Sequence, residues 1–147
     1  MYYTIGEMAE RSGISASALR YYDKEGLLPD VERSAGGRRM FREEDAEWLR
    51  IIECLKKTGM SVKEIKQFVS WVKEGDSTIE RRLELIEKQR QTVLKQMEKL
   101  SETLETLEYK KWYYSVAAEA GTCKVHKTLS DDRIPENIRK IKERLNG

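Results

Sequence analysis

A long run of helix-forming residues without a helix breaker constrains this chain more than any other feature. From Ser77 to Lys111 the sequence contains no Gly or Pro. Apolar residues recur there at alternating spacings of three and four, and Arg90 fills the one polar position. This is the heptad pattern of a coiled coil. The apolar stripe consists of Leu83, Ile86, Val93, Met97, Leu100, Leu104 and Leu107.

A single helix cannot bury such a stripe by itself, so the pattern predicts a partner for it. At 1.5 Å per residue the helix spans roughly 50 Å. We expect it to dimerise, as an antiparallel pair with its own copy. The alternative, a helix of a larger bundle, needs further helices, and the remaining chain is short for that. The charged fraction of 37% and the two prolines also favour a mainly helical protein.

The residues before this helix carry two short helical patterns joined by a tight turn. Thr4 and Glu7 have the spacing of a capping box. Gly13 allows a sharp turn, and Ser15 can cap a second helix that runs to about Lys24. Such a pair fits a helix-turn-helix. A helical hairpin in any small core is the alternative interpretation.

A basic hairpin is predicted next, within residues 30–41. Gly36 and Gly37 separate two short extended segments, which is typical of a hairpin turn. Arg38 and Arg39 follow at once. A basic hairpin behind a helix-turn-helix is a wing, suited to DNA phosphates. A solvated basic loop remains the alternative.

Two more helices follow, from about Glu43 to Lys57 and from a cap at Ser61. Four lysines surround their junction, and the N-terminus of the second helix can also bind phosphate. These lysines are Lys56, Lys57, Lys63 and Lys66. Residues 1–66 hold 12 Lys or Arg and 12 Asp or Glu, so the DNA hypothesis depends on where the charges lie.

Five segments of this region stand in a characteristic order: Ile5–Ala9, Leu19–Asp23, Gly26–Pro29, Gly37–Phe41 and Thr58–Ser61. Together they resemble the MerR family of bacterial transcription regulators over residues 2–72. The resemblance implies a DNA-binding domain of four helices and two wings. An antiparallel dimerisation coil and a variable effector region would follow it.

The resemblance also implies partners and roles. Family members bind double-stranded promoter DNA as homodimers, act with RNA polymerase, and kink and untwist a spacer that is too long. Arg20 is the best candidate for a contact to a base or a neighbouring phosphate, and Phe41 and Arg42 depart from the family pattern. The residues expected at the DNA are Ser15, Ser17, Arg20, Tyr21, Arg38, Arg39, Lys57, Ser61 and Lys63.

We therefore expect a mainly α chain with three parts. Residues 1–75 form a winged helix-turn-helix domain, residues 76–112 the dimerisation helix, and residues 113–147 an effector or tail segment. In the tail, Pro135 can begin a last helix with Ile134, Ile138, Ile141 and Leu145 on one face.

Several interpretations of effector sensing stand side by side. The run around Cys54 resembles the aldehyde- and thiol-stress branch of the family, and nearby lysines favour the reactive thiolate. Alternatively Cys54 packs inertly, because it lies close to Ile52 and Leu55. Cys123 and His126 are too few for a closed metal site. An apolar ligand against the aromatic residues 112–114 is a further option.

Other functional classes fit the sequence poorly. One His, no nucleophile motif and no Gly-rich phosphate loop argue against an enzyme or a bound cofactor. No apolar run approaches the roughly 20 residues that span a bilayer. The N-terminus does not resemble a signal peptide, so we expect a cytoplasmic protein with reduced thiols. An interaction protein whose coil recruits a partner remains the main alternative to a DNA-binding regulator.

Overall fold

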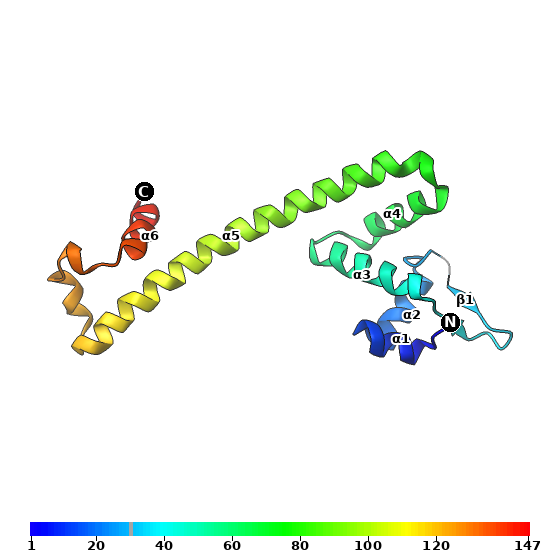
Figure 1. Cartoon of the computed structure of the whole chain (residues 1–147), viewed down its shortest axis with the longest axis horizontal. Coiled ribbons are helices and arrows are strands. Elements are labelled where there is room, and N and C mark those ends of the chain that lie inside the picture. The colour runs from blue at the N-terminus through cyan, green and yellow to red at the C-terminus, as the bar shows by residue number, and fades with distance from the viewer. Residues whose placement is uncertain (30) are drawn as a thin grey trace. The chain divides into compact units, whose positions relative to one another are not determined.

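The computed structural model describes residues 1–29 and 31–147, so Asp30, at the start of the expected hairpin segment, lies outside the described residues. Helices dominate the chain (Figure 1). In order, the elements are α1 (Ile5–Ser12), α2 (Ala16–Lys24), β1 (Glu32–Arg33), β2 (Arg39–Met40), α3 (Glu43–Lys57), α4 (Val62–Glu74), η1 (Asp76–Thr78), α5 (Ile79–Ala120), η2 (Cys123–Lys127), η3 (Asp131–Arg133) and α6 (Glu136–Asn146). The mainly α winged fold with a long following helix is thus confirmed.

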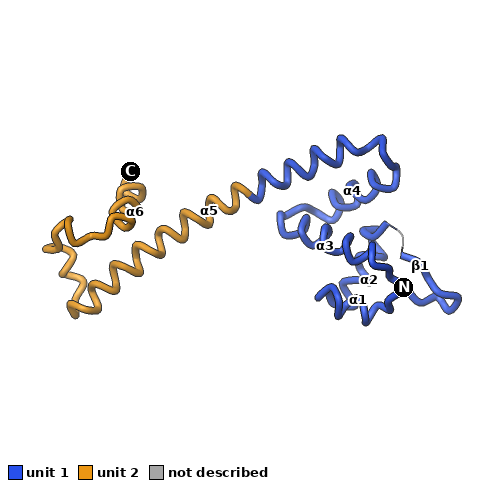
Figure 2. The backbone as a smooth tube through the Cα atoms, in the orientation of Figure 1, with its two compact units in different colours: residues 1–93 blue, residues 94–147 orange. Residues whose placement is uncertain are grey.

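The chain forms two compact units, residues 1–93 and residues 94–147, which Figure 2 colours blue and orange. The long helix α5 begins in the first unit and ends in the second. Within the described residues, no helix is both long enough and apolar enough to cross a membrane.

Local capping signals determine where the first helices begin. The Thr4 hydroxyl accepts from the Glu7 backbone N–H at 3.2 Å, and the Thr4 N–H donates to the Glu7 carboxylate at 2.8 Å. This reciprocal pair is the predicted capping box. Gly13 ends α1 with φ +73°, a left-handed conformation that favours glycine.

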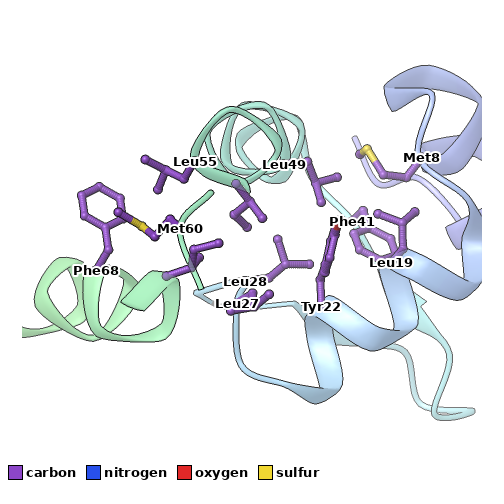
Figure 3. Close-up of a cluster of buried hydrophobic side chains, with 12 residues drawn as sticks. Met8, Leu19, Tyr22, Leu27, Leu28, Phe41, Leu49, Leu55, Met60 and Phe68 are labelled. Atoms are coloured by element: carbon purple, nitrogen blue, oxygen red, sulfur yellow. The ribbon is translucent and has the colours of Figure 1, made fainter. Parts of the chain in front are cut away.

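One apolar cluster holds the first unit together (Figure 3). It joins side chains from α1 to α4 with Phe41, which is fully buried at the end of the hairpin. Its buried members are Met8, Leu19, Tyr22, Leu27, Leu28, Phe41, Leu49, Ile52, Leu55, Met60, Ile65 and Phe68. The cluster fixes α2 against α3 and leaves the other face of α2 to solvent.

The predicted hairpin is a two-stranded antiparallel sheet. Glu32 pairs with Met40, and Arg33 pairs with Arg39. The N-terminal segment extends it, because Tyr3 and Phe41 exchange backbone hydrogen bonds of 2.7 and 2.9 Å. The hairpin therefore attaches to the core through Phe41.

Ser77 and Glu80 have the spacing of a capping box, but α5 begins at Ile79, behind the turn η1. The turn η1 leads directly into the helix, and Thr78 rather than Ser77 is the buried hydroxyl residue. The Thr78 hydroxyl contacts the carbonyl oxygens of Trp71 at 2.5 Å and Gly75 at 2.8 Å. It thereby satisfies the end of α4 instead of capping α5.

The second unit is a helical hairpin between α5 and α6. The helix α5 continues to Ala120, beyond residue 112, where the dimerisation helix was expected to end. Ile134, Ile138 and Ile141 pack against α5, and the Arg144 guanidinium lies 2.6 Å from the Glu105 carboxylate. The buried isoleucines agree with the predicted helical face. Leu145 does not, because it is half exposed.

Candidate DNA-binding surface

The polar face of α2 is the first part of this surface. The Ser15 hydroxyl accepts from the Ala18 backbone N–H at 3.1 Å and begins the helix, as the sequence predicts. Leu19 and Tyr22 point into the core. The 3.6-residue period then leaves four side chains exposed on the other side. They are Ser15, Ser17, Arg20 and Tyr21, the expected recognition-helix residues.

A polar network fixes α2 to α3. The Tyr22 hydroxyl donates to the Glu53 carboxylate, and Lys56 Nζ donates to the same hydroxyl at 2.6 Å. Burial, followed by the bond to Glu53, raises the pKa of the Tyr22 phenol. The bond to Tyr22 raises the pKa of Lys56. Sequence reasoning missed this network, because Tyr22 and Lys56 are 34 residues apart.

The hairpin forms the first wing. Its turn closes with hydrogen bonds from Ser34 N–H to Arg38 O at 2.8 Å and from Gly37 N–H to Ser34 O at 2.9 Å. Arg38 is exposed at the turn. Arg39, by contrast, is only one-fifth exposed, and its Nε lies 2.7 Å from Asp23 Oδ2. The other expected wing arginine is therefore held against the end of α2.

The pair between Arg39 and Asp23 has two consequences. It joins β2 to α2, and Arg33 of β1 reaches the same carboxylate at 3.5 Å. Asp23 therefore helps to fix the wing beside α2. A guanidinium carries five N–H donors. The single bond from Nε leaves its terminal nitrogens available for a phosphate.

The turn between α3 and α4 forms the second wing. The Ser61 hydroxyl accepts from the Glu64 backbone N–H at 3.2 Å and caps α4. The Glu64 carboxylate accepts from that hydroxyl at 3.0 Å, so Ser61 forms the predicted cap with both the backbone and the side chain of Glu64. Lys57 and Lys63 are exposed beside this cap.

The remaining lysines of the expected cluster have protein partners. Lys56 bonds to Tyr22, and Lys66 Nζ lies 3.0 Å from the Glu25 carboxylate. Among the basic residues expected at the DNA, Arg20, Arg38, Lys57 and Lys63 form no ion pair with any of residues 1–29 and 31–147. Some of the expected basic side chains are thus bonded within the protein, whereas the four without an ion pair are open to a ligand.

Cys54 is exposed, which argues against the alternative that it packs inertly. Two residues along a helix are about 200° around it, which places Cys54 opposite Ile52. Its side chain lines a cleft of about 770 Å³ between α3 and the turn after α1. The charged residues of this cleft are Arg11, Glu43, Arg50, Glu53 and Lys57.

The apolar stripe of α5 is uncovered in the single chain. Every member is exposed, from Val93 at 36% to Leu100 at 69%. Leu85, one residue from Ile86, instead packs against the core of the first unit. The stripe therefore lies on a face of α5 that its own chain does not cover.

The aromatic end of α5 packs against the tail. The His126 ring stacks on the Tyr113 ring at 3.8 Å, and its Nε2 lies 2.8 Å from the Tyr113 carbonyl oxygen. Trp112 meets His126 edge to face at 5.3 Å. His126 thus has a packing role, while Cys123 is exposed. No group of three potential metal ligands exists in the described part of the chain.

These features define a class of protein, a winged helix-turn-helix chain with a long α5 carrying an uncovered apolar stripe. Two family models match it. The model described as MerR HTH family regulatory protein matches residues 3–70, and the model described as MerR, DNA binding matches residues 46–109.

Relatives extend the match to nearly the whole chain. An HTH-type transcriptional regulator of Haemophilus influenzae is 48% identical, with 92% of this chain and 98% of the relative covered. The regulator YyaN of Bacillus subtilis is 35% identical, with 80% of this chain and 94% of the relative covered. The chain belongs to the MerR family and is a transcriptional regulator. Its relatives are regulators rather than enzymes, as the sequence predicts for this chain.

Solved structures give the same family. The chain is similar to HiNmlR, a MerR family regulator lacking the sensor domain, whose crystal structure is bound to promoter DNA. The TM-score is 0.77 at 48% identity, covering 85% of this chain and 99% of HiNmlR. A MerR family regulator from Bacillus thuringiensis matches with a TM-score of 0.68 at 44% identity, covering 75% of this chain and 96% of that one.

Proposed function

We propose that this regulator binds promoter DNA as a homodimer, with α2 in the major groove. The observation that carries the proposal is the exposed polar face of α2, where Arg20 has no ion pair with any described residue. Arg20 can form the two parallel hydrogen bonds that recognise guanine. The promoter-bound structure of HiNmlR, a relative at 48% identity, supports this assignment.

The two wings grip the phosphates on either side of that groove. Arg38 and the free terminal nitrogens of Arg39 serve the first wing. Lys57, Lys63 and the backbone N–H groups behind Ser61 serve the second, because a helix N-terminus attracts anions. Such contacts fix position and orientation but carry no sequence information.

The stripe of α5 forms the dimer. Side chains that are 36–69% exposed would be covered by the antiparallel α5 of a second copy. Two copies place two recognition helices on one face of the DNA, as a palindromic site requires. Phosphate contacts from both copies offset the several kcal/mol needed to deform a promoter spacer. RNA polymerase would then bind promoter elements that the deformation of the spacer has aligned.

Footprinting on the DNA upstream of the regulator's own gene tests this function. We expect protection of a promoter spacer with hypersensitivity at its centre. Arg20→Ala should weaken binding at some base positions more than others, while Arg38→Ala should weaken it equally everywhere and reduce the salt slope by about one. Arg133→Ala, an exposed tail variant, is the matched control. Absence of protection at moderate salt would instead favour a coil that recruits a protein partner.

A second proposal concerns Cys54 as the site where electrophile stress is sensed. Its exposure in the cleft between α3 and the turn after α1 supports access for a small electrophile. The thiolate sulfur would add to an aldehyde carbonyl carbon, and the carbonyl oxygen would take a proton from water.

Two cysteine variants separate sensing from non-specific thiol chemistry. Cys54→Ser should abolish the transcriptional response to formaldehyde, whereas Cys123→Ser, the other exposed cysteine, should keep it. Mass spectrometry should find the adduct at Cys54. A response that survives Cys54→Ser would end this proposal and leave DNA binding untouched.

A further inference from the structure

The first turns of α5 present two different faces. Leu83 and Ile86 begin the exposed stripe. Arg82, Leu85 and Gln89, also at spacings of three and four, point toward the DNA-binding domain and are half-buried. The faces are offset by one residue, which is about 100° around the helix.

The inner face is attached to the domain at both ends. Arg82 Nη2 donates to the Gly75 carbonyl oxygen at 3.1 Å, and Leu85 packs against the apolar cluster. Two turns further on, the Thr58 hydroxyl contacts Gln89 Oε1 at 2.8 Å. The same hydroxyl contacts the Leu55 carbonyl oxygen at 2.6 Å, so its single proton is shared by both acceptors.

The attachment at Gln89 lies at the junction between α3 and α4. Thr58 follows Lys57 and immediately precedes the turn that leads to Ser61 and α4. Gln89 and Arg82 are seven residues apart, which is about 10 Å along the helix. Two attachments at this separation fix the direction of α5, whereas one alone would act as a pivot.

We propose that Gln89 and Thr58 are positioning residues that set the operator half-site separation this regulator prefers. The inference depends on the proposed binding of DNA as a homodimer. In such a dimer the direction of α5 relative to its own domain determines how far apart the two recognition helices lie. The separation of half-sites is then a geometric property of the protein. Without the Thr58–Gln89 contact, each domain rotates about its remaining attachment and accepts a wider range of separations.

The experiment compares operators that differ only at their centre. The operator identified by footprinting is compared with versions that have one base pair added or removed at its centre, at constant salt. The measured quantity is the ratio of dissociation constants between the altered and the original operator. Gln89→Ala and Thr58→Val should lower that ratio by roughly two- to tenfold, the effect of one neutral hydrogen bond.

Two controls keep the test specific. Gln96→Ala alters the same residue type one heptad further on, where the side chain is exposed, and should keep the wild-type ratio. Thr58→Ser retains the hydroxyl and should also keep the wild-type ratio. This result would exclude a general folding defect as the cause of the change in Thr58→Val. A ratio in Gln89→Ala equal to that of the wild type would overturn this inference while DNA binding stands. A wild type that binds no operator at any separation would overturn the proposed function as well.

Discussion

Shortening Leu100 to alanine tests the proposed dimer through the most exposed member of the α5 stripe. Leu100 is 69% exposed in the single chain, so the substitution leaves the fold of one copy nearly unchanged. Leu→Ala removes about three carbons at about 0.8 kcal/mol each, which gives about 1.7 kcal/mol for the exposed fraction. Two copies lose about 3.3 kcal/mol together, which corresponds to a dimer dissociation constant about 200-fold higher.

Sedimentation equilibrium over a range of protein concentrations measures this constant directly. Leu145→Ala is the matched control, because Leu145 is 48% exposed but lies on α6, outside the stripe. We expect the control to dimerise within about threefold of the wild type, since uninvolved surface changes stay within about 0.5 kcal/mol. An unchanged dissociation constant for Leu100→Ala would refute the assignment of this stripe to the dimer.

Three further substitutions test other parts of the structure. Asp23→Asn removes the charge that holds both strands of the wing to α2, so operator affinity should fall by up to about fivefold for every sequence. Competition binding measures this affinity. A loss confined to one base position would contradict the role of Asp23 in fixing the wing. Thr4→Ala should lower the free energy of unfolding by about 0.5–2 kcal/mol in urea denaturation, and Thr4→Ser should restore most of it. The hydrogen bond from Arg11 lowers the pKa of the Glu43 carboxyl, so ionised Glu43 stabilises the fold above its unfolded-state pKa and ceases to do so as the pH falls through the lowered value. Glu43→Gln should therefore melt below the wild type near neutral pH and together with it in acid; a difference that persists in acid would contradict the ion pair.

Local signals in the sequence were sufficient for most helix boundaries. The caps at Thr4, Ser15 and Ser61 act within three residues, so their partners can be read from the chain directly. The period of α3 also predicts that Cys54 is exposed. The alternative of inert packing counted neighbours along the chain instead of angles around the helix. In these cases the structure depends on interactions between residues that are close together in the sequence.

The missed contacts of the candidate site join residues far apart in the sequence. Arg39 and Asp23 are 16 residues apart, and Thr58 and Gln89 are 31 apart. Composition and periodicity say nothing about such pairs, because each depends on how the helices meet in space. The distinction between Arg38, exposed, and Arg39, bonded to Asp23, could therefore come only from the structure.

The two faces of α5 also limit how the length of this helix can change during evolution. An insertion of one residue between Gln89 and Leu100 would turn the rest of the stripe by about 100° relative to the face that holds the DNA-binding domain. Seven inserted residues would restore the register of both faces and move the domains apart along the axis, while three or four would leave a local change of winding. Relatives that differ in α5 length should therefore differ by whole heptads, or carry a matching change in the residues at the inner face.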